Sequence, residues 1–130
     1  MDAIERWHAI ARTRDAEALH DLLDPDAVFE SPVVHAPQVG RAITMRYLLG
    51  AMQVLGNETF RYTGEWRSAD GAVLEFETDL DGAKVNGVDI IRLSDDGKRI
   101  VHFKVMVRPR RAMEAVHQLM GALLAQMSQR

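Results

Sequence analysis

The stretch Val85-Asn86-Gly87-Val88-Asp89-Ile90-Ile91-Arg92-Leu93 decides the fold of this chain. Its β-branched and aliphatic residues, followed by the turn residues Ser94-Asp95-Asp96-Gly97, predict a strand that ends in a turn. One carboxylate, Asp89, lies in the middle of this apolar run. A buried charge is costly unless it is paired, protonated or open to water, so Asp89 is the first candidate for a functional residue.

This strand belongs to a series of four that Asp-Gly dipeptides separate. The dipeptides lie at positions 70–71, 81–82 and 96–97, and such pairs are strong hairpin signals. Polar residues alternate with Phe60, Tyr62 and Trp66 before the first dipeptide, and with Leu74, Phe76, Thr78 and Leu80 after it. The last strand runs from about Ile100 to Val107. The alternation predicts an antiparallel meander with one apolar face, which helices should cover.

Apolar residues at helical spacing predict three helices before the meander and one after it. The expected helix starts are Asp2, Asp15, Gly40 and Pro109. Asp24-Pro25 should end the second helix, and a short strand is expected at Val28–Ser31. The order of helices, meander and closing helix predicts one α+β domain over residues 1–130.

The composition excludes several classes of function. The chain has 130 residues, 47% of them hydrophobic, and a formal net charge of -3, which gives no attraction to nucleic acid or to an anionic membrane. It has no cysteine, so disulfides, thiolate metal sites and a cysteine nucleophile are excluded. The five histidines show no metal-binding spacing, and we expect neither a metal nor a cofactor. The N-terminus lacks an apolar signal core and no run is long enough to span a membrane, so we expect a cytoplasmic protein.

The order of these elements resembles that of the nuclear transport factor 2-like (NTF2-like) superfamily, and within it the SnoaL-like proteins. The resemblance covers nearly the whole chain and is carried by residues 24–32, 40–43, 87–93 and 97–105. It implies a cone in which N-terminal helices pack on a curved antiparallel sheet, closed by a C-terminal helix. This scaffold carries isomerases, dehydratases, cyclases, hydrolases and proteins without chemistry, so the fold alone does not decide the activity.

Comparison with two enzyme families of this fold is informative because the match is partial. Ketosteroid isomerases use a carboxylate base where this chain has Ser31, and a tyrosine donor where it has Trp7. Their protonated aspartic acid corresponds to Asp89, which is retained. A serine without a basic partner cannot replace a carboxylate in moving a proton, so steroid isomerisation by that mechanism is rejected. The limonene epoxide hydrolase pattern also fails, because it needs an arginine where Gly87 stands.

Two residues are candidates for acid and base. Burial should raise the pKa of Asp89 and make it a general acid or hydrogen-bond donor to a bound carbonyl. Alternatively, Asp89 is held by backbone amides or by the Trp7 indole and only ties helix to sheet. His35 follows the break at Pro32 and titrates near neutral pH, which suits a base, although histidines often only cap loops.

Shared alternation, together with the cone that the chain resembles, predicts a cavity that binds a small apolar ligand, carbonyl-containing or polycyclic. The expected ligand-binding residues are Trp7, Ser31, Tyr62, Trp66, Phe76 and Phe103. Three functions remain open. The first is a cofactor-free isomerase, dehydratase or cyclase that uses Asp89 and His35. The second is a non-catalytic carrier or sensor, and the third is a structural dimerisation module with a filled core.

The residues on the opposite face of the meander predict a homodimer. By alternation this outer face holds the apolar residues Val73, Val88, Ile90, Ile100 and Met106, among acids and bases. Contiguous apolar residues on a sheet face usually mark a contact, and the resemblance points to the same surface. The basic segment 108–111 is interpreted as a solvated or interface patch, since no aromatic nucleic-acid platform accompanies it.

Overall fold

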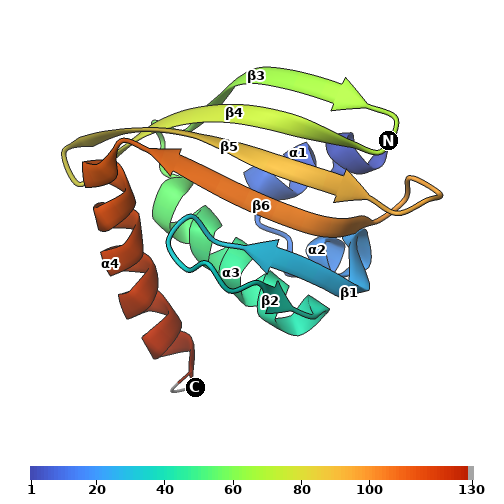
Figure 1. Ribbon diagram of the computed structural model, residues 1–130, viewed down its shortest axis with the longest axis horizontal. Coiled ribbons are helices and arrows are strands. Elements are labelled where there is room, and N and C mark those ends of the chain that lie inside the picture. The colour runs from blue at the N-terminus through green and yellow to red at the C-terminus, as the bar shows by residue number, and fades with distance from the viewer. Residues whose placement is uncertain (129–130) are drawn as a thin grey trace.

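The computed structural model describes residues 1–128, and the predicted α+β cone is confirmed. The helices among these residues are α1 (Ala3–Thr13), α2 (Ala16–Leu22), α3 (Arg41–Leu55) and α4 (Arg110–Ser128). The strands are β1 (Leu23–Glu30), β2 (Gln38–Val39), β3 (Arg61–Ser68), β4 (Gly71–Leu80), β5 (Ala83–Leu93) and β6 (Ile100–Arg108). Figure 1 shows α1, α2 and α3 on one side of the sheet, with α4 extending from its end.

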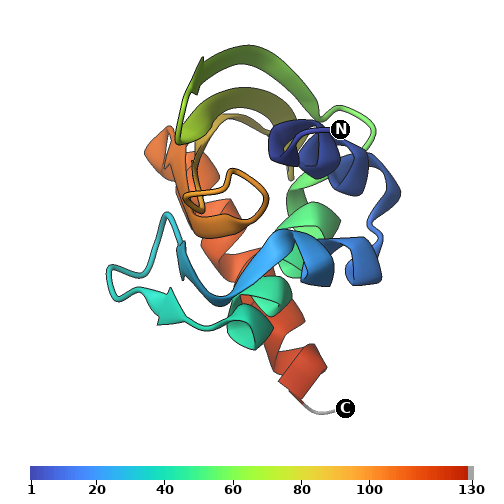
Figure 2. The same cartoon turned by 90° about the vertical axis from the view of Figure 1, so that its right-hand side faces the viewer.

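The strands form one sheet in the order β2-β1-β6-β5-β4-β3. Strands β3 to β6 are the predicted antiparallel meander. The sheet also contains a parallel pair, because β1 lies beside β6 with Phe29 opposite Phe103. The sheet curls around the helices when it is viewed from the end (Figure 2), and this curvature gives the cone its hollow side.

The helix starts follow from local capping. Asp2 accepts a hydrogen bond from the backbone N–H of Glu5, and Asp15 accepts one from Ala18, which satisfies free donors in each first turn. The second helix ends at Leu22, just before the predicted stop, and β1 begins at Leu23 rather than Val28. The strand tolerates the proline at position 25 because its register with β6 shifts between residues 23 and 28.

The inner face of β4 and β5 is packed as the alternation predicted. Phe76 lies opposite Gly87, and both are buried. A side chain at position 87 would not fit, since a Cβ there would come within 2.4 Å of the Phe76 ring and 2.6 Å of the Met106 carbonyl oxygen. Gly87 therefore lets the Phe76 ring lie over β5, two residues from Asp89.

Two register shifts correct the predicted faces. Tyr62 pairs with Phe76 but Gly64 pairs with Glu75, so one extra residue in β3 reverses the alternation after Tyr62. Trp66 consequently lies on the outer face with 59% of its surface exposed, and its predicted place in the cavity is wrong. A second shift in β6, between the partners of Arg92 and Leu93, turns Ile100 inward. Ile100 is fully buried, so its predicted place on the outer face is also wrong.

Candidate functional site

Asp89 lies at the centre of β5, between Leu74 of β4 and Val105 of β6. Its side chain is on the inner face, and the residue is 6% exposed. It borders a cavity of about 60 Å³, which we call the inner cavity. Five aromatic side chains line it: Trp7 of α1, Phe60 just before β3, Tyr62 of β3, Phe76 of β4 and Phe103 of β6. Residues of α3, among them Leu55, close the other side.

A chain of two hydrogen bonds holds the Asp89 carboxyl in place. The Trp7 indole N–H donates to the Tyr62 hydroxyl oxygen at 3.0 Å. The Tyr62 O–H in turn donates to Asp89 Oδ2 at 2.6 Å. Trp7 therefore reaches Asp89 through Tyr62 and not directly. No hydrogen bond from residues 1–128 reaches Asp89 Oδ1, so this oxygen is left for whatever enters the inner cavity.

The surroundings of Asp89 favour its neutral form. Burial raises the pKa of Asp89 to about 7, and the hydrogen bond from Tyr62 opposes this shift only in part. Burial and the nearby carboxylate raise the pKa of Tyr62 well above its ordinary value, so the phenol stays protonated as the donor. Because Oδ2 accepts from Tyr62, the proton of the neutral acid belongs on Oδ1. The site thus presents an O–H donor to an apolar cavity near neutral pH.

Stacked and edge-on rings keep the cavity wall rigid. The Trp7 ring meets Phe103 edge-on at 4.8 Å between centroids, and Phe60 stacks on Phe76 at 5.3 Å. Tyr62 meets Phe60 edge-on at 5.1 Å, which fixes the ring that carries the donor hydroxyl. Four of the predicted ligand-binding residues therefore surround Asp89: Trp7, Tyr62, Phe76 and Phe103.

A second cavity, of about 190 Å³, adjoins the first one, and we call it the outer cavity. It lies among α3, α4 and the segment after β1, and its wall is mainly apolar. Three of its residues also line the inner cavity: Ala51, Leu55 and Val105. The outer cavity also holds Ser31, Tyr47 and His117, of which only Ser31 was predicted. Tyr47 and His117 follow helical spacing in the sequence, and only the packing of α3 against α4 shows that they share a cavity.

The structure does not bring His35 to Asp89. His35 is exposed in the segment between β1 and β2 and borders a shallow hollow beside Lys104 and Met106. The Ser31 side chain accepts hydrogen bonds from the backbone N–H groups of Val33 and Val34, which holds this segment in a turn directed away from β5. The hypothesis that His35 and Asp89 form an acid–base pair across one cavity is therefore not supported by this arrangement.

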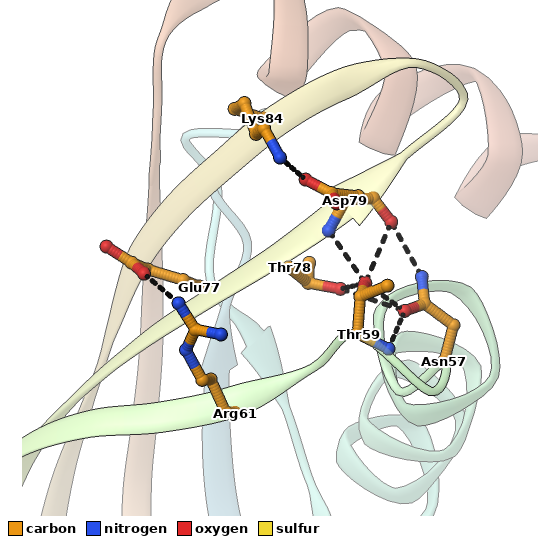
Figure 3. Close-up of polar contacts among 7 residues, drawn as sticks. All are labelled: Asn57, Thr59, Arg61, Glu77, Thr78, Asp79 and Lys84. Carbon is orange, nitrogen blue, oxygen red and sulfur yellow. Dashed lines mark hydrogen bonds and ion pairs between the residues drawn. The ribbon is translucent and has the colours of Figure 1, made fainter.

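A wide hollow of about 1130 Å³ on the surface lies away from Asp89. Its charged walls are already partly paired, as Figure 3 shows, by Arg61 with Glu77 at 3.2 Å and by Lys84 with Asp79 at 2.8 Å. Exposed pairs of this kind neither desolvate nor activate a ligand, so we give this hollow no chemical role.

Figure 3 also shows how one end of the cavity wall is anchored. Thr78 of β4 donates a hydrogen bond to Asn57 Oδ1 at 3.1 Å, and Asn57 donates to the Asp79 carbonyl at 2.7 Å. Thr78 also bonds the carbonyl oxygen of Leu55 at the last turn of α3. These bonds tie α3, which lines both cavities, to the sheet.

Residues 1–128 contain no group of three histidine, aspartate or glutamate side chains placed to hold a metal ion. Within the same range, no helix is long and apolar enough to cross a membrane.

The fold and the buried carboxyl define a class of protein, namely an α+β cone with an apolar cavity that is lined by one carboxyl group, that of Asp89. The chain belongs to the SnoaL-like domain family, whose match extends over residues 4–103, and the resemblance drawn from the sequence is confirmed. No match was found among curated proteins.

Solved structures agree with this assignment. A steroid delta-isomerase from Pseudomonas aeruginosa is 38% identical, with a TM-score of 0.91 over 98% of this chain and 93% of that one. An uncharacterized protein with a cystatin-like fold from Silicibacter pomeroyi is 29% identical, with a TM-score of 0.84 over 92% of this chain and 83% of that one. An NTF2-like protein from Burkholderia xenovorans shares the fold at 17% identity, with a TM-score of 0.64 over 86% and 88% of the two chains.

Proposed function

We propose that this domain binds a small apolar molecule through one carbonyl or hydroxyl group, which hydrogen-bonds to Asp89 in the inner cavity. The observation that carries the proposal is a buried carboxyl with one oxygen held by Tyr62 and the other left for the cavity. With the pKa of Asp89 at about 7, the neutral acid donates to a carbonyl oxygen while the apolar wall excludes water. The family and its isomerase-like neighbour support a ligand-binding domain of this kind.

A matched pair of probes tests this proposal. Acetone and 2-methylpropene are small enough for the inner cavity and have nearly the same shape, but only the ketone accepts a hydrogen bond. The chain has two tryptophans, so in a Trp66→Phe background the fluorescence of Trp7 alone reports on the inner cavity. We expect the ketone to bind more tightly than the alkene by about 3- to 10-fold, the net worth of one hydrogen bond.

The pH dependence of ketone binding identifies the donor. Above pH 7, ketone affinity should fall as Asp89 ionises and loses the donated proton, by about the 3- to 10-fold that this hydrogen bond contributes. In Asp89→Asn the amide oxygen can accept from Tyr62 and the amide N–H can donate to the ketone, so binding should not depend on pH. Asp89→Leu should remove the preference for the ketone. Equal affinity for the two probes in the parent protein would contradict the proposal.

A second candidate function, isomerisation of an unsaturated ketone, is favoured by the similarity to the steroid delta-isomerase. Asp89 could stabilise the negative charge that develops on the carbonyl oxygen. The proton on carbon needs a base, however, and neither Ser31 nor His35 lines the inner cavity. We therefore place binding first. Turnover of cyclohex-3-enone, followed by absorbance of the conjugated enone and lost in Asp89→Leu, would establish the second function instead.

We also propose that two copies associate through the outer face of the sheet. Trp66 lies opposite Val73, and Val73 lies opposite Ile90, so an apolar row crosses three strands. Val88 lies opposite Met106 beside this row, and Met106 is 50% exposed. A self-complementary patch of this type suits a two-fold contact, in which each patch meets its own copy.

A further inference from the structure

We propose that the inner and outer cavities act as one elongated site, whose ligand carries a hydrogen-bond acceptor at each end. This inference rests on the proposed function and names the class of ligand more closely. One acceptor meets Asp89, and the apolar middle of the molecule passes Ala51 and Leu55. The second acceptor meets the polar side chains of the outer cavity.

The two cavities share a wall of small and aliphatic residues. Ala51, Leu55 and Val105 line both of them, so only apolar atoms lie where the cavities meet. Each cavity alone, at about 60 and 190 Å³, is smaller than the roughly 300 Å³ at which ordinary ligand pockets begin. Only the two together come close to that size, so a ligand with an apolar body would have to extend into both.

The outer cavity holds three polar side chains from separate elements: Ser31 after β1, Tyr47 on α3 and His117 on α4. We call these the outer donors. Ser31 Oγ accepts from two backbone N–H groups, so its lone pairs are used and its own O–H proton is left to donate. The Tyr47 ring stacks on Phe29 at 5.2 Å. Within residues 1–128, neither the Tyr47 hydroxyl nor the His117 imidazole makes a hydrogen bond.

The polar side chains of the outer cavity determine which chemical group of a ligand can bind there. No aspartate or glutamate lines it, so hydroxyl and imidazole groups provide its polarity. Such groups favour an acceptor such as a hydroxyl, carbonyl or carboxylate oxygen. A purely hydrocarbon end would leave these groups without partners at that end of the site, and this costs affinity.

A series of linear probes tests the proposal. Alkan-2-ones of increasing length are compared with the same ketones that carry a terminal hydroxyl, by Trp7 fluorescence in the Trp66→Phe background. Adding a hydroxyl normally weakens binding to an apolar site because the group loses its water. We expect this penalty to disappear at one chain length, where the hydroxyl reaches the outer donors. At that length Tyr47→Phe or His117→Leu should weaken the hydroxyketone about 3- to 10-fold and leave the plain ketone unchanged.

A second variant tests the continuity of the two cavities. Ala51→Leu adds three carbon atoms where the cavities meet. Binding of the long ketones should fall at least tenfold, while acetone, which needs only the inner cavity, should lose less affinity than they do. If acetone loses as much affinity in the Ala51→Leu protein as the long ketones, the Tyr47→Phe comparison, which preserves the ring and its stacking on Phe29, decides the question.

The outcomes separate the two proposals. If ketones depend on Asp89 but a terminal hydroxyl weakens binding at every length, the elongated site is refuted and the proposed function stands. If no ketone depends on Asp89, the proposed function itself fails. If long ketones bind to the Ala51→Leu protein as they do to the parent protein, the ligand does not pass between the cavities, and the elongated site is again refuted.

Discussion

Replacing Asp89 with asparagine should change how the stability of this protein depends on pH. The carboxyl is buried in an apolar cavity, and burial raises its pKa to about 7 from the ordinary value of 3.8. Between these two values the unfolded chain ionises its aspartate while the native protein keeps the proton. The unfolded state therefore binds fewer protons, and the free energy of unfolding falls as pH rises through this window.

The expected magnitude follows from the two pKa values. Each unit of difference corresponds to about 1.4 kcal/mol, so the whole window is worth on the order of 4 kcal/mol. Between pH 5 and pH 8 the Asp89 contribution should lower the free energy of unfolding by about 2.5 kcal/mol. Above pH 7 the native carboxyl also ionises and the loss levels off. A change of this size is a large share of the 5–15 kcal/mol that is typical of small domains.

Urea unfolding of the parent protein and of Asp89→Asn across this pH range measures the effect. All other titrating groups are common to both proteins, so the difference between the two curves isolates Asp89. That difference should move in favour of Asp89→Asn by about 2.5 kcal/mol from pH 5 to pH 8. The exposed Asp70, whose pKa is lowered by a hydrogen bond from Ser68, is the matched control. Asp70→Asn should show no such trend above pH 5.

The opposite result would refute the reasoning. If Asp89→Asn loses stability relative to the parent protein as pH rises, the native carboxyl is ionised and well bonded. Asp89 would then be a structural residue that ties helix to sheet, which is the alternative that the sequence left open.

Three further predictions concern neighbouring parts of the molecule. Tyr62→Phe removes the hydrogen bond to Asp89, so the pKa of Asp89 should rise further. The midpoint of ketone binding against pH measures this pKa, and a lower midpoint in the variant would show that the bond does not favour the carboxylate. Gly87→Ala should cost about 1–3 kcal/mol in urea unfolding because the new methyl group meets the Phe76 ring and the Met106 carbonyl oxygen. An unchanged midpoint would mean that both the ring and the backbone of β6 move aside at little cost. Ile90→Glu should convert the dimer to a monomer, as measured by sedimentation at tens of micromolar, and should leave the circular dichroism spectrum unchanged. If the parent protein itself sediments as a monomer at this concentration, the proposed interface is refuted.

The sequence by itself determined the strands of the meander and the face on which Asp89 lies. Side chains alternate along a regular strand, and the run from Val85 to Leu93 contains no irregularity, so counting residues places Asp89 inside. Asp-Gly turns and Asp caps act within a few residues of themselves. These local rules also predicted that Phe76 and Asp89 share a face.

Only the tertiary structure decided how these residues are combined. The bulge after Tyr62 reverses the face of Trp66. Gly64 is a local signal for a bulge in this strand, but only the pairing with β4 shows that an extra residue is inserted there. The parallel pairing of β1 with β6 joins segments about seventy residues apart, and it directs the chain after Ser31 away from Asp89. His35 is therefore separated from the carboxyl that was expected to be its partner.

The tertiary structure also decided which residue donates a hydrogen bond to Asp89. The sequence offered the Trp7 indole as one possible partner, but the Tyr62 hydroxyl stands between the two and makes the shorter bond. Which polar groups meet in a core depends on the packing of α1 against β3 and β5, which residue types and spacing do not specify. Local periodicity therefore placed the acid, and three-dimensional packing decided its donor and its pKa.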